Sequence, residues 1–229
     1  MMRLALFVLL SMNAVFAANP RVLYIGDSHT TGAFGAELDR LMRTLPSQEV
    51  ATYGSCGSAP IHWNTSWGKT YNTKCGYYEH VLNGKPVSIY PSNNATPKLE
   101  NLLNTLKPNT VVVALGANMI GNSDAQIEKQ TQEMAQAITK FGAKCIWVGP
   151  PNNRMNQTAL PMLYPLIQKT VESVGCIFVD SRPYTKYPAT GGDGRHYDSI
   201  KNGGKKMAQD WAAATNRGLR RGLSLQNGT

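Results

Sequence analysis

Short apolar segments alternate along this chain with segments whose apolar residues recur at helical spacing, and this alternation limits the folds open to it. Strands that are apolar along their whole length and alternate with helices are typical of a parallel sheet covered on both faces. We therefore predict an α/β fold, a three-layer α/β/α sandwich of flavodoxin-like arrangement around a central five-stranded parallel sheet. The expected strands are 21–26, 50–53, 110–115, 145–148 and 176–179, and the expected helices are 34–44, 99–106, 123–141, 163–174 and 203–215.

The length of 229 residues fits a single domain. One region, 58–97, interrupts the alternation, because it is rich in Gly, Asn, Pro, Tyr and Trp and has no sustained period. A connection of this length is usually functional or disordered. Its aromatic residues and the cysteines that bracket it favour an ordered loop. We predict a domain over 18–222 with an aromatic loop insertion at 58–97, followed by a flexible tail at 223–229.

The first residues have the pattern of a secretory signal peptide. Arg3 precedes an apolar run at 4–10, and a small-residue cleavage site ends at Ala17. The run is shorter than the roughly 18 apolar residues that a membrane span requires. We therefore expect residues 1–17 to be removed. The mature protein is predicted to be soluble, secreted or periplasmic, and without integral membrane association.

The four cysteines are informative in an exported protein, because an oxidising compartment allows them to pair. Four cysteines allow three pairings, and the sequence alone does not choose among them. We favour Cys56–Cys75 and Cys145–Cys176, with two buried free thiols as the alternative for the second pair. The chain has no CxxC motif and only four His, so no metal site is expected.

The formal net charge is +9, and part of the excess lies in Arg217, Arg220 and Arg221 near the C-terminus. Such a charge can attract nucleic acid, but an exported protein rarely meets it, so we expect no nucleic-acid partner. Two interpretations remain. One is attraction to an anionic envelope polymer, and the other is solubility charge on a solvated surface.

Three polar motifs follow expected strands, where active residues gather in sheets of this type. GDSHT, which contains Ser28, follows the first strand; GAN, which ends at Asn118, follows the third; DGRH, from Asp193 to His196, lies beyond the last. A Ser hydroxyl is a weak nucleophile that needs a neighbouring base. Asp and His three residues apart can share one turn, so that the carboxylate orients the imidazole. Singly, each motif also fits an ordinary turn or an exposed His, but their order and common position favour a serine hydrolase.

In these motifs the chain resembles the SGNH hydrolases, also called the GDSL family, whose pattern is a GDS block, a Gly, GxN and DxxH in this order. The resemblance covers nearly the whole mature chain. It implies an acyl-enzyme mechanism without a metal or organic cofactor. The site residues that it implies are Ser28 as nucleophile and oxyanion donor, His196 as base, Asp193 as the acid that orients it, and Gly57 and Asn118 as further oxyanion donors. Gly54 is the alternative to Gly57.

The spelling GDSH, in which His29 follows the serine, is similar to family members that act on acyl groups of polysaccharides, including acyltransferases. His29 also fits a local hydrogen-bonding role at a helix start. Trp63 and Trp67, from the polar and aromatic loop, are candidate substrate-binding residues together with His29, since aromatic faces stack on sugar rings. The same aromatic residues also fit a small core within the loop.

We therefore predict a monomeric serine esterase that cleaves O-acyl esters, O-acetyl above all, on a carbohydrate or cell-envelope glycan or on a small ester. The alternatives are an O-acyltransferase on a glycan, a lipase or thioesterase, and a non-catalytic glycan-binding module. The complete set of triad and oxyanion residues argues against the last.

Overall fold

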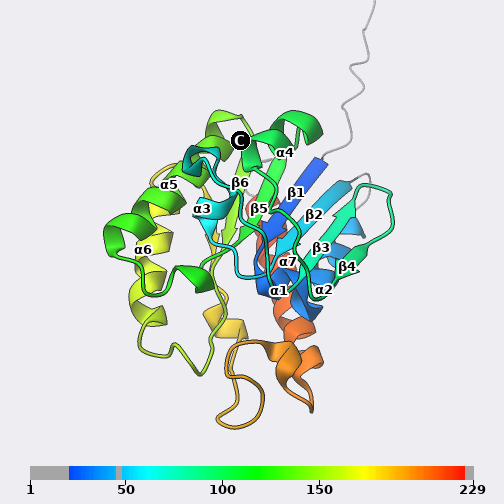
Figure 1. The fold of residues 1–229 in the computed structure, drawn as a ribbon, viewed down its shortest axis with the longest axis vertical. Helices are drawn as coiled ribbons and strands as arrows, with labels where there is room; N and C mark the ends of the chain where they lie inside the picture. Colours follow the sequence, from blue (N-terminus) through cyan, green and yellow to red (C-terminus); the bar gives the residue numbers. More distant parts are fainter. Residues whose placement is uncertain (1–20, 45–47, 225–229) are drawn as a thin grey trace, which may run out of the picture.

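The computed structural model describes residues 21–44 and 48–224, which form a seven-stranded sheet with helices on both faces (Figure 1). The predicted signal peptide at 1–17 lies outside the described residues, as do residues 225–229 of the predicted tail. The strand order is β4-β3-β2-β1-β5-β6-β7. The strands are β1 (Arg21–Gly26), β2 (Glu49–Ser55), β3 (Tyr77–Val81), β4 (Val87–Ile89), β5 (Thr110–Ala114), β6 (Lys144–Val148) and β7 (Ile177–Val179).

Five neighbouring strands, β2-β1-β5-β6-β7, run parallel, which confirms the predicted fold class and the five parallel strands. The sheet is nevertheless larger than predicted, because β3 and β4 extend it in antiparallel orientation beyond β2. Both strands lie within 58–97, the region that the sequence analysis treated as a loop. This region also contains α3 (Pro60–Trp63) and the 3₁₀ helix η1 (Thr65–Trp67).

Most residues of the parallel strands β1, β2, β5 and β6 are buried because both faces of the sheet are covered. In β1, Val22 and Tyr24 belong to the core formed with α2 and α7, whereas Leu23 and Ile25 belong to the core formed with α4, α5 and α6. The helix α7 is longer than expected and continues two residues into the predicted tail. The remaining helices are α1 (Ser28–Thr31), α2 (Ala33–Arg43), α4 (Leu99–Leu106), α5 (Asp124–Lys140), α6 (Leu160–Glu172) and α7 (Gly204–Ser224), with η2 (Ala117–Met119), η3 (Arg182–Tyr184) and η4 (Tyr197–Ser199) in the connections.

Two disulfides confirm the predicted cysteine pairs. Cys145–Cys176 joins β6 to the residue before β7, and both of its cysteines are buried. Cys56–Cys75 joins the residue after β2 to the segment that leads into β3. Over the described ranges, no helix combines the length and apolar character that a membrane crossing requires.

The strand order reverses at β1, which has β2 on one side and β5 on the other. In open α/β sheets, ligands bind outside the carboxyl ends of the strands at such a point. Ser28 follows β1, Gly57 follows β2 and Asn118 follows β5. The fold therefore places three of the residues singled out in the sequence after the carboxyl ends of three neighbouring strands.

Candidate active site

Ser28 stands at a sharp turn between β1 and α1. Asp27 caps this short helix, because one of its carboxylate oxygens accepts the N–H of His29 at 3.0 Å. Gly26 allows the turn to close: a Cβ at this position would lie 2.0 Å from the Thr30 hydroxyl oxygen and 2.9 Å from the carbonyl oxygen of Ala114. The turn therefore fixes Ser28 at the edge of the sheet.

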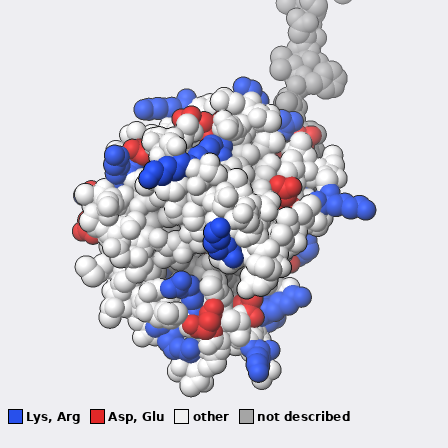
Figure 2. Space-filling view, viewed as in Figure 1, with Lys and Arg blue, Asp and Glu red and all other residues white. Residues whose placement is uncertain are grey.

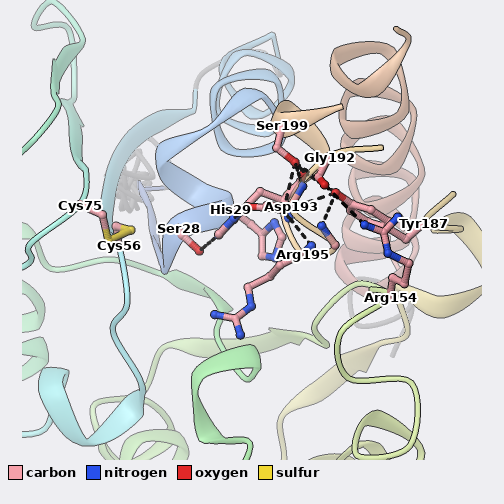
Figure 3. A network of polar contacts seen from close by, with 12 residues as sticks. Ser28, His29, Cys56, Cys75, Arg154, Tyr187, Gly192, Asp193, Arg195 and Ser199 are labelled. Carbon is pink, nitrogen blue, oxygen red and sulfur yellow. Dashed lines mark hydrogen bonds and ion pairs between the residues drawn. A yellow bond between two sulfur atoms is a disulfide. The ribbon is translucent and has the colours of Figure 1, made fainter. Parts of the chain in front are cut away.

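His196 links the Ser28 hydroxyl to the carboxylate of Asp193, and Figure 3 labels the serine and the aspartate. Its Nε2 lies 2.9 Å from Ser28 Oγ, and its Nδ1 lies 2.6 Å from Asp193 Oδ2. A carboxylate only accepts, so Nδ1 carries the proton in this pair and Nε2 is left to accept from the serine hydroxyl. The side chains of Ser28, His196 and Asp193 thus form a continuous hydrogen-bonded series, although the serine lies far from the other two in the sequence.

Asp193 is held by several donors besides the imidazole. Its Oδ1 accepts the main-chain N–H groups of Arg195 at 2.8 Å and His196 at 2.7 Å, and the hydroxyl of Ser199 at 3.0 Å. Partial burial alone would raise the pKa of Asp193, but the hydrogen bonds from His196 and Arg195 lower it well below its usual value. The group is therefore a carboxylate at neutral pH and keeps His196 in the required tautomer.

Gly57 forms the turn after β2 with a positive φ of 79°, a conformation that favours glycine. The carbonyl of the preceding residue, Cys56, accepts the hydroxyls of Tyr71 at 3.2 Å and Thr73 at 2.8 Å. In a trans peptide the N–H points opposite to the C=O. These two bonds therefore fix the direction of the Gly57 N–H. No group of the described chain accepts a hydrogen bond from this N–H.

Gly54, the alternative to Gly57, lies inside β2 and is paired with strands on both sides. Its Cα also faces α1 closely, since a Cβ there would lie 3.1 Å from atoms of Thr30 and Thr31. A main-chain group in the middle of a sheet is not available to a ligand. Of the two glycines, Gly57 therefore remains the candidate oxyanion donor.

Asn118 lies in η2, after β5, and its side-chain amide points into the same crevice. The Nδ2 donates to the carbonyl of Ser58 at 2.9 Å and lies 3.5 Å from a carboxylate oxygen of Asp27. Asp27 is 2% exposed, and this burial raises its pKa to about 6. The amide is thus fixed from the β2 turn and from the β1 turn at once.

Two of the three candidate substrate-binding residues are wrongly assigned. Trp63 is fully buried and donates its indole N–H to Ser58 at 3.0 Å, so it belongs to the core. His29 is 7% exposed and packs against the rings of His196 and Trp211, each with its centroid 5.4 Å away. Tyr77 and Tyr78, two further aromatic residues of the region 58–97, are buried in β3.

Trp67, the third candidate, is partly exposed and lines a groove of about 560 Å³. The groove begins at Asn118 and runs between α5 on one side and α3 with η1 on the other. Its lining is mostly polar: Asn118, Asn122, Gln126, Lys129, Gln130, Glu133, His62, Ser66 and Trp67, with Ala59 and Ile61. A ligand bound at Ser28 can therefore extend over a polar surface.

Four supporting residues escaped the sequence analysis. Tyr71 and Thr73 hold the Cys56 carbonyl, and Ser199 and Tyr187 surround Asp193, with the Tyr187 hydroxyl 3.3 Å from Asp193 Oδ1. Ser199 lies three residues after His196, a spacing that could have suggested a shared turn. The other three are distant in sequence and leave no local signal.

Comparison with known proteins shows similarity in structure alone. No family model matches the sequence, and no curated protein is significantly similar to it. A catalytic mutant of an acetylxylan esterase from Geobacillus stearothermophilus is 15% identical, with a TM-score of 0.55 over 87% of this chain and 94% of that chain. A family 3 carbohydrate esterase from Clostridium thermocellum is 16% identical, with a TM-score of 0.56 and coverages of 88% and 98%.

A lipase/acylhydrolase from Enterococcus faecalis is 18% identical, with a TM-score of 0.55 over 87% of this chain and 95% of that chain. At such identities the likeness concerns the fold. The chain has the SGNH hydrolase fold that its motifs suggested.

Proposed function

We propose that this protein is a serine ester hydrolase whose nucleophile is Ser28. The observation that carries the proposal is the series Ser28–His196–Asp193, with contacts of 2.9 Å and 2.6 Å. A base within hydrogen-bond reach of a hydroxyl, itself oriented by a third group, is the arrangement that activates serine. The neighbouring N–H groups supply the second requirement, which is stabilisation of the charge that develops on the carbonyl oxygen.

The reaction follows from these positions. Ser28 Oγ attacks the ester carbonyl carbon while its proton passes to His196 Nε2. The carbonyl oxygen becomes an oxyanion and accepts hydrogen bonds from the N–H groups of Ser28 and Gly57 and from the amide of Asn118. The C–O bond then breaks, the alcohol leaves with the proton from His196, and the acyl group stays on Ser28. A water molecule, deprotonated by the same imidazole, releases the acid and restores the hydroxyl.

We propose an O-acetyl group on a glycan as the ester. A long acyl chain requires an apolar cleft, whereas the groove beside Asn118 is lined mainly by amide and charged side chains with Trp67 at its far part. Proteins of the same fold include an acetylxylan esterase, a peptidoglycan O-acetylesterase and a carbohydrate esterase. The predicted export of the chain would bring it to envelope or extracellular polymers.

Replacement of the nucleophile tests the proposal. Ser28→Ala should lower the turnover of an aryl acetate by about 10⁴-fold or more, since loss of a triad member leaves only the oxyanion hole and binding. The thermal unfolding midpoint should change little, because the side chain lies at a turn. Ser173→Ala is the matched control: this serine ends α6, at the opposite edge of the sheet, and should leave turnover unchanged. Substantial residual activity in Ser28→Ala would remove Ser28 from its role.

The acyl group is tested separately with a chain-length series from acetyl to octanoyl esters and with acetylated glycans. We expect the highest kcat/KM for acetyl and measurable acetate release from the glycan. Activity that rises toward octanoyl, without acetate release, would replace the glycan proposal by the lipase alternative. Adding a sugar acceptor to the same assay separates hydrolysis from acyl transfer.

A further inference from the structure

Arg195 lies between the two residues of the Asp193–His196 pair, and its side chain forms no hydrogen bond or ion pair with the residues that the structure describes. The main-chain N–H donates to Asp193 at 2.8 Å, which fixes the start of the side chain. The residue is partly exposed, and no carboxylate or carbonyl of the described chain accepts a hydrogen bond from its guanidinium. Figure 3 shows Arg195 beside Asp193, in the same cluster of side chains as Ser28.

Arg154, which contacts the same loop, differs from Arg195 in that its guanidinium has partners. The guanidinium of Arg154 donates to the carbonyls of Pro188 and Gly191 at 3.1 Å and 3.0 Å, so it supports the loop itself. The planar guanidinium of an arginine can donate five hydrogen bonds. When none of these donors has an acceptor in the protein, all of them are available to a ligand. Arg195 therefore has a different use from Arg154.

Three acids lie close to Arg195 in sequence or interact with its charge, and each already accepts hydrogen bonds. Asp193 accepts from His196 and Ser199, and Asp198 accepts the N–H of Ala33 at 2.8 Å. Asp27 is buried at the base of the site and accepts the N–H of His29. None of the three neutralises the guanidinium through an ion pair.

The charge of Arg195 reaches the reacting centre. Burial dominates the pKa shifts of Asp27 and His29, but the positive charge of Arg195 lowers the pKa of both side chains. These two residues flank Ser28 in the sequence. An anion bound to Arg195 would therefore lie beside the ester under attack, and the surplus of basic residues spread over this face favours its approach (Figure 2).

We propose that Arg195 binds a carboxylate of the substrate, so that the preferred substrate is an O-acetylated acidic sugar. This inference rests on the proposed function and narrows its substrate class. A guanidinium binds a carboxylate through two parallel N–H···O bonds, which fix orientation as well as charge. The sugar ring that carries the carboxylate is then held with its acetyl ester at Ser28, and the chain continues along the groove toward Trp67.

The test compares two probes that differ only in charge: an O-acetylated methyl glucuronoside and its carboxamide. Acetate release should give a kcat/KM for the acid that is about 10- to 100-fold higher than for the amide, the range expected for a charge-assisted hydrogen-bonded pair. In Arg195→Gln the ratio should fall to within about threefold of one, and Arg195→Lys should keep part of it. Raising the salt concentration should lower the ratio in the unaltered protein.

Arg217→Gln is the matched control, because it removes the same charge from an exposed position 13 residues along α7, about 20 Å from the start of that helix. Its ratio should equal that of the unaltered protein. A ratio near one in the unaltered protein, or a high ratio that persists in Arg195→Gln, would overturn the proposal. So would hydrolysis of an aryl acetate without hydrolysis of either sugar probe.

A binding measurement keeps this inference separate from the proposed function. Calorimetry with the Ser28→Ala variant should show tighter binding of the acid than of the amide, and the double variant with Arg195→Gln should bind both alike. If no ester is hydrolysed by the unaltered protein but this binding difference appears, the esterase proposal fails and the assignment of Arg195 stands. Equal binding of both probes to Ser28→Ala contradicts the assignment of Arg195 whatever the activity.

Discussion

Two ionisable side chains flank Ser28 in the sequence, and both are buried. Burial raises the pKa of Asp27 to about 6 and lowers that of His29 to about 3, with His196 acting on His29 in the same direction. Above pH 6 the nucleophile therefore has a charged carboxylate on one side and a neutral imidazole on the other. The two shifts have opposite effects on stability when the pH falls.

The Asp27→Asn variant isolates one of these effects. The unfolded chain ionises this carboxyl near its usual value of 3.8, whereas the folded protein holds the proton until about pH 6. The free energy of unfolding therefore loses a contribution as the pH rises from about 4 to 6, and the loss is complete above that range. Asparagine keeps the shape and does not titrate, so the variant should gain about 3 kcal/mol relative to the unaltered protein between pH 4 and pH 7.

Urea unfolding of both proteins at the two pH values provides the measurement. The difference between the proteins is the relevant quantity, since His29 titrates in an overlapping range: its lowered pKa makes stability fall as the pH drops below 6.5 toward 3. Both proteins share that contribution. A difference in unfolding free energy that is the same at pH 4 and pH 7 would contradict the role given to Asp27.

Thr73 acts on the site through a main-chain group. It is fully buried, and its hydroxyl donates to the Cys56 carbonyl at 2.8 Å, which orients the Gly57 N–H. Thr73→Val keeps the shape and removes the donor. We expect kcat and kcat/KM for an aryl acetate to fall together by about tenfold, as for loss of an interaction made only in the transition state.

Thr170→Val is the control for that variant, because Thr170 is also buried and its hydroxyl also donates to a main-chain carbonyl, that of Leu166 at 2.7 Å, but in α6. It should lower stability and leave kcat unchanged. A rise in KM alone for Thr73→Val would mean that Thr73 supports substrate binding and not the oxyanion.

At the scale of elements, the hairpin of β3 and β4 marks the limit of the sequence analysis. The parallel strands were predictable because burial on both faces leaves an unbroken apolar run, as in 110–115. The strand β3 reads Tyr-Tyr-Glu-His-Val and shows no such run, and β4 has three exposed residues. The polar residue His80 is accommodated within the fold, because its ring contacts Asp39 of α2, a partner 41 residues away. No local pattern reveals such a partner.

The residues of the candidate site also fall into those that the sequence could predict and those that it could not. Ser28, Asn118 and His196 follow strands or precede helices, so their positions could be inferred from the order of elements. The environment of Trp63 could not, because it depends on how α3 packs on the core, and a loop without a period does not show which side faces inward. The sequence motifs thus indicate where a residue lies relative to the strands. Whether its side chain is buried depends on how the elements pack.

Asp39 joins three elements and should be the most sensitive acid outside the site. It is 2% exposed, and it contacts Arg43 of its own helix at 3.0 Å, Thr52 of β2 at 2.5 Å and His80 of β3 at 2.6 Å. Asp39→Ala removes the carboxylate that pairs with the Arg43 guanidinium and accepts from the buried Thr52 hydroxyl, so we expect the free energy of unfolding to fall by about 3–5 kcal/mol.

Glu37→Ala, on the same helix, is the matched comparison. Glu37 pairs with the exposed Arg40 at 2.6 Å, and such surface pairs contribute roughly 0–1 kcal/mol. Chemical denaturation of the two variants should give clearly different midpoints. Similar midpoints would mean that the contacts of Asp39 are not coupled to folding.

At the scale of the whole molecule, the sheet brings together two site residues that lie far apart in the sequence. Ser28 comes from the first strand, and His196 lies 168 residues later, beyond the last strand. The hydrogen bond between them therefore forms only when the complete parallel sheet has assembled. Truncation on the C-terminal side of β7 would leave the serine hydroxyl without its base.

The two disulfides should separate stability from activity. Cys56–Cys75 closes a segment with a sequence separation of 19 next to Gly57, whereas Cys145–Cys176 lies between β6 and β7. Replacing either pair with serines should lower the free energy of unfolding by about 2–4 kcal/mol. Only loss of the first pair should also lower kcat, which turnover of an aryl acetate would measure. Equal kcat values for the two variants would contradict this.

Because Cys56 precedes Gly57, we expect the activity of this protein to depend on the redox state of the compartment that holds it. Cys56 carries both the sulfur that is oxidised and the carbonyl that orients the Gly57 N–H. A newly made chain in a reducing compartment holds two thiols there, and the turn that must stabilise the oxyanion lacks its crosslink. We therefore expect a lower kcat for the reduced chain than for the oxidised one. With the proposed export, ester cleavage would be fastest in the oxidising compartment that the proposed polymer substrate shares.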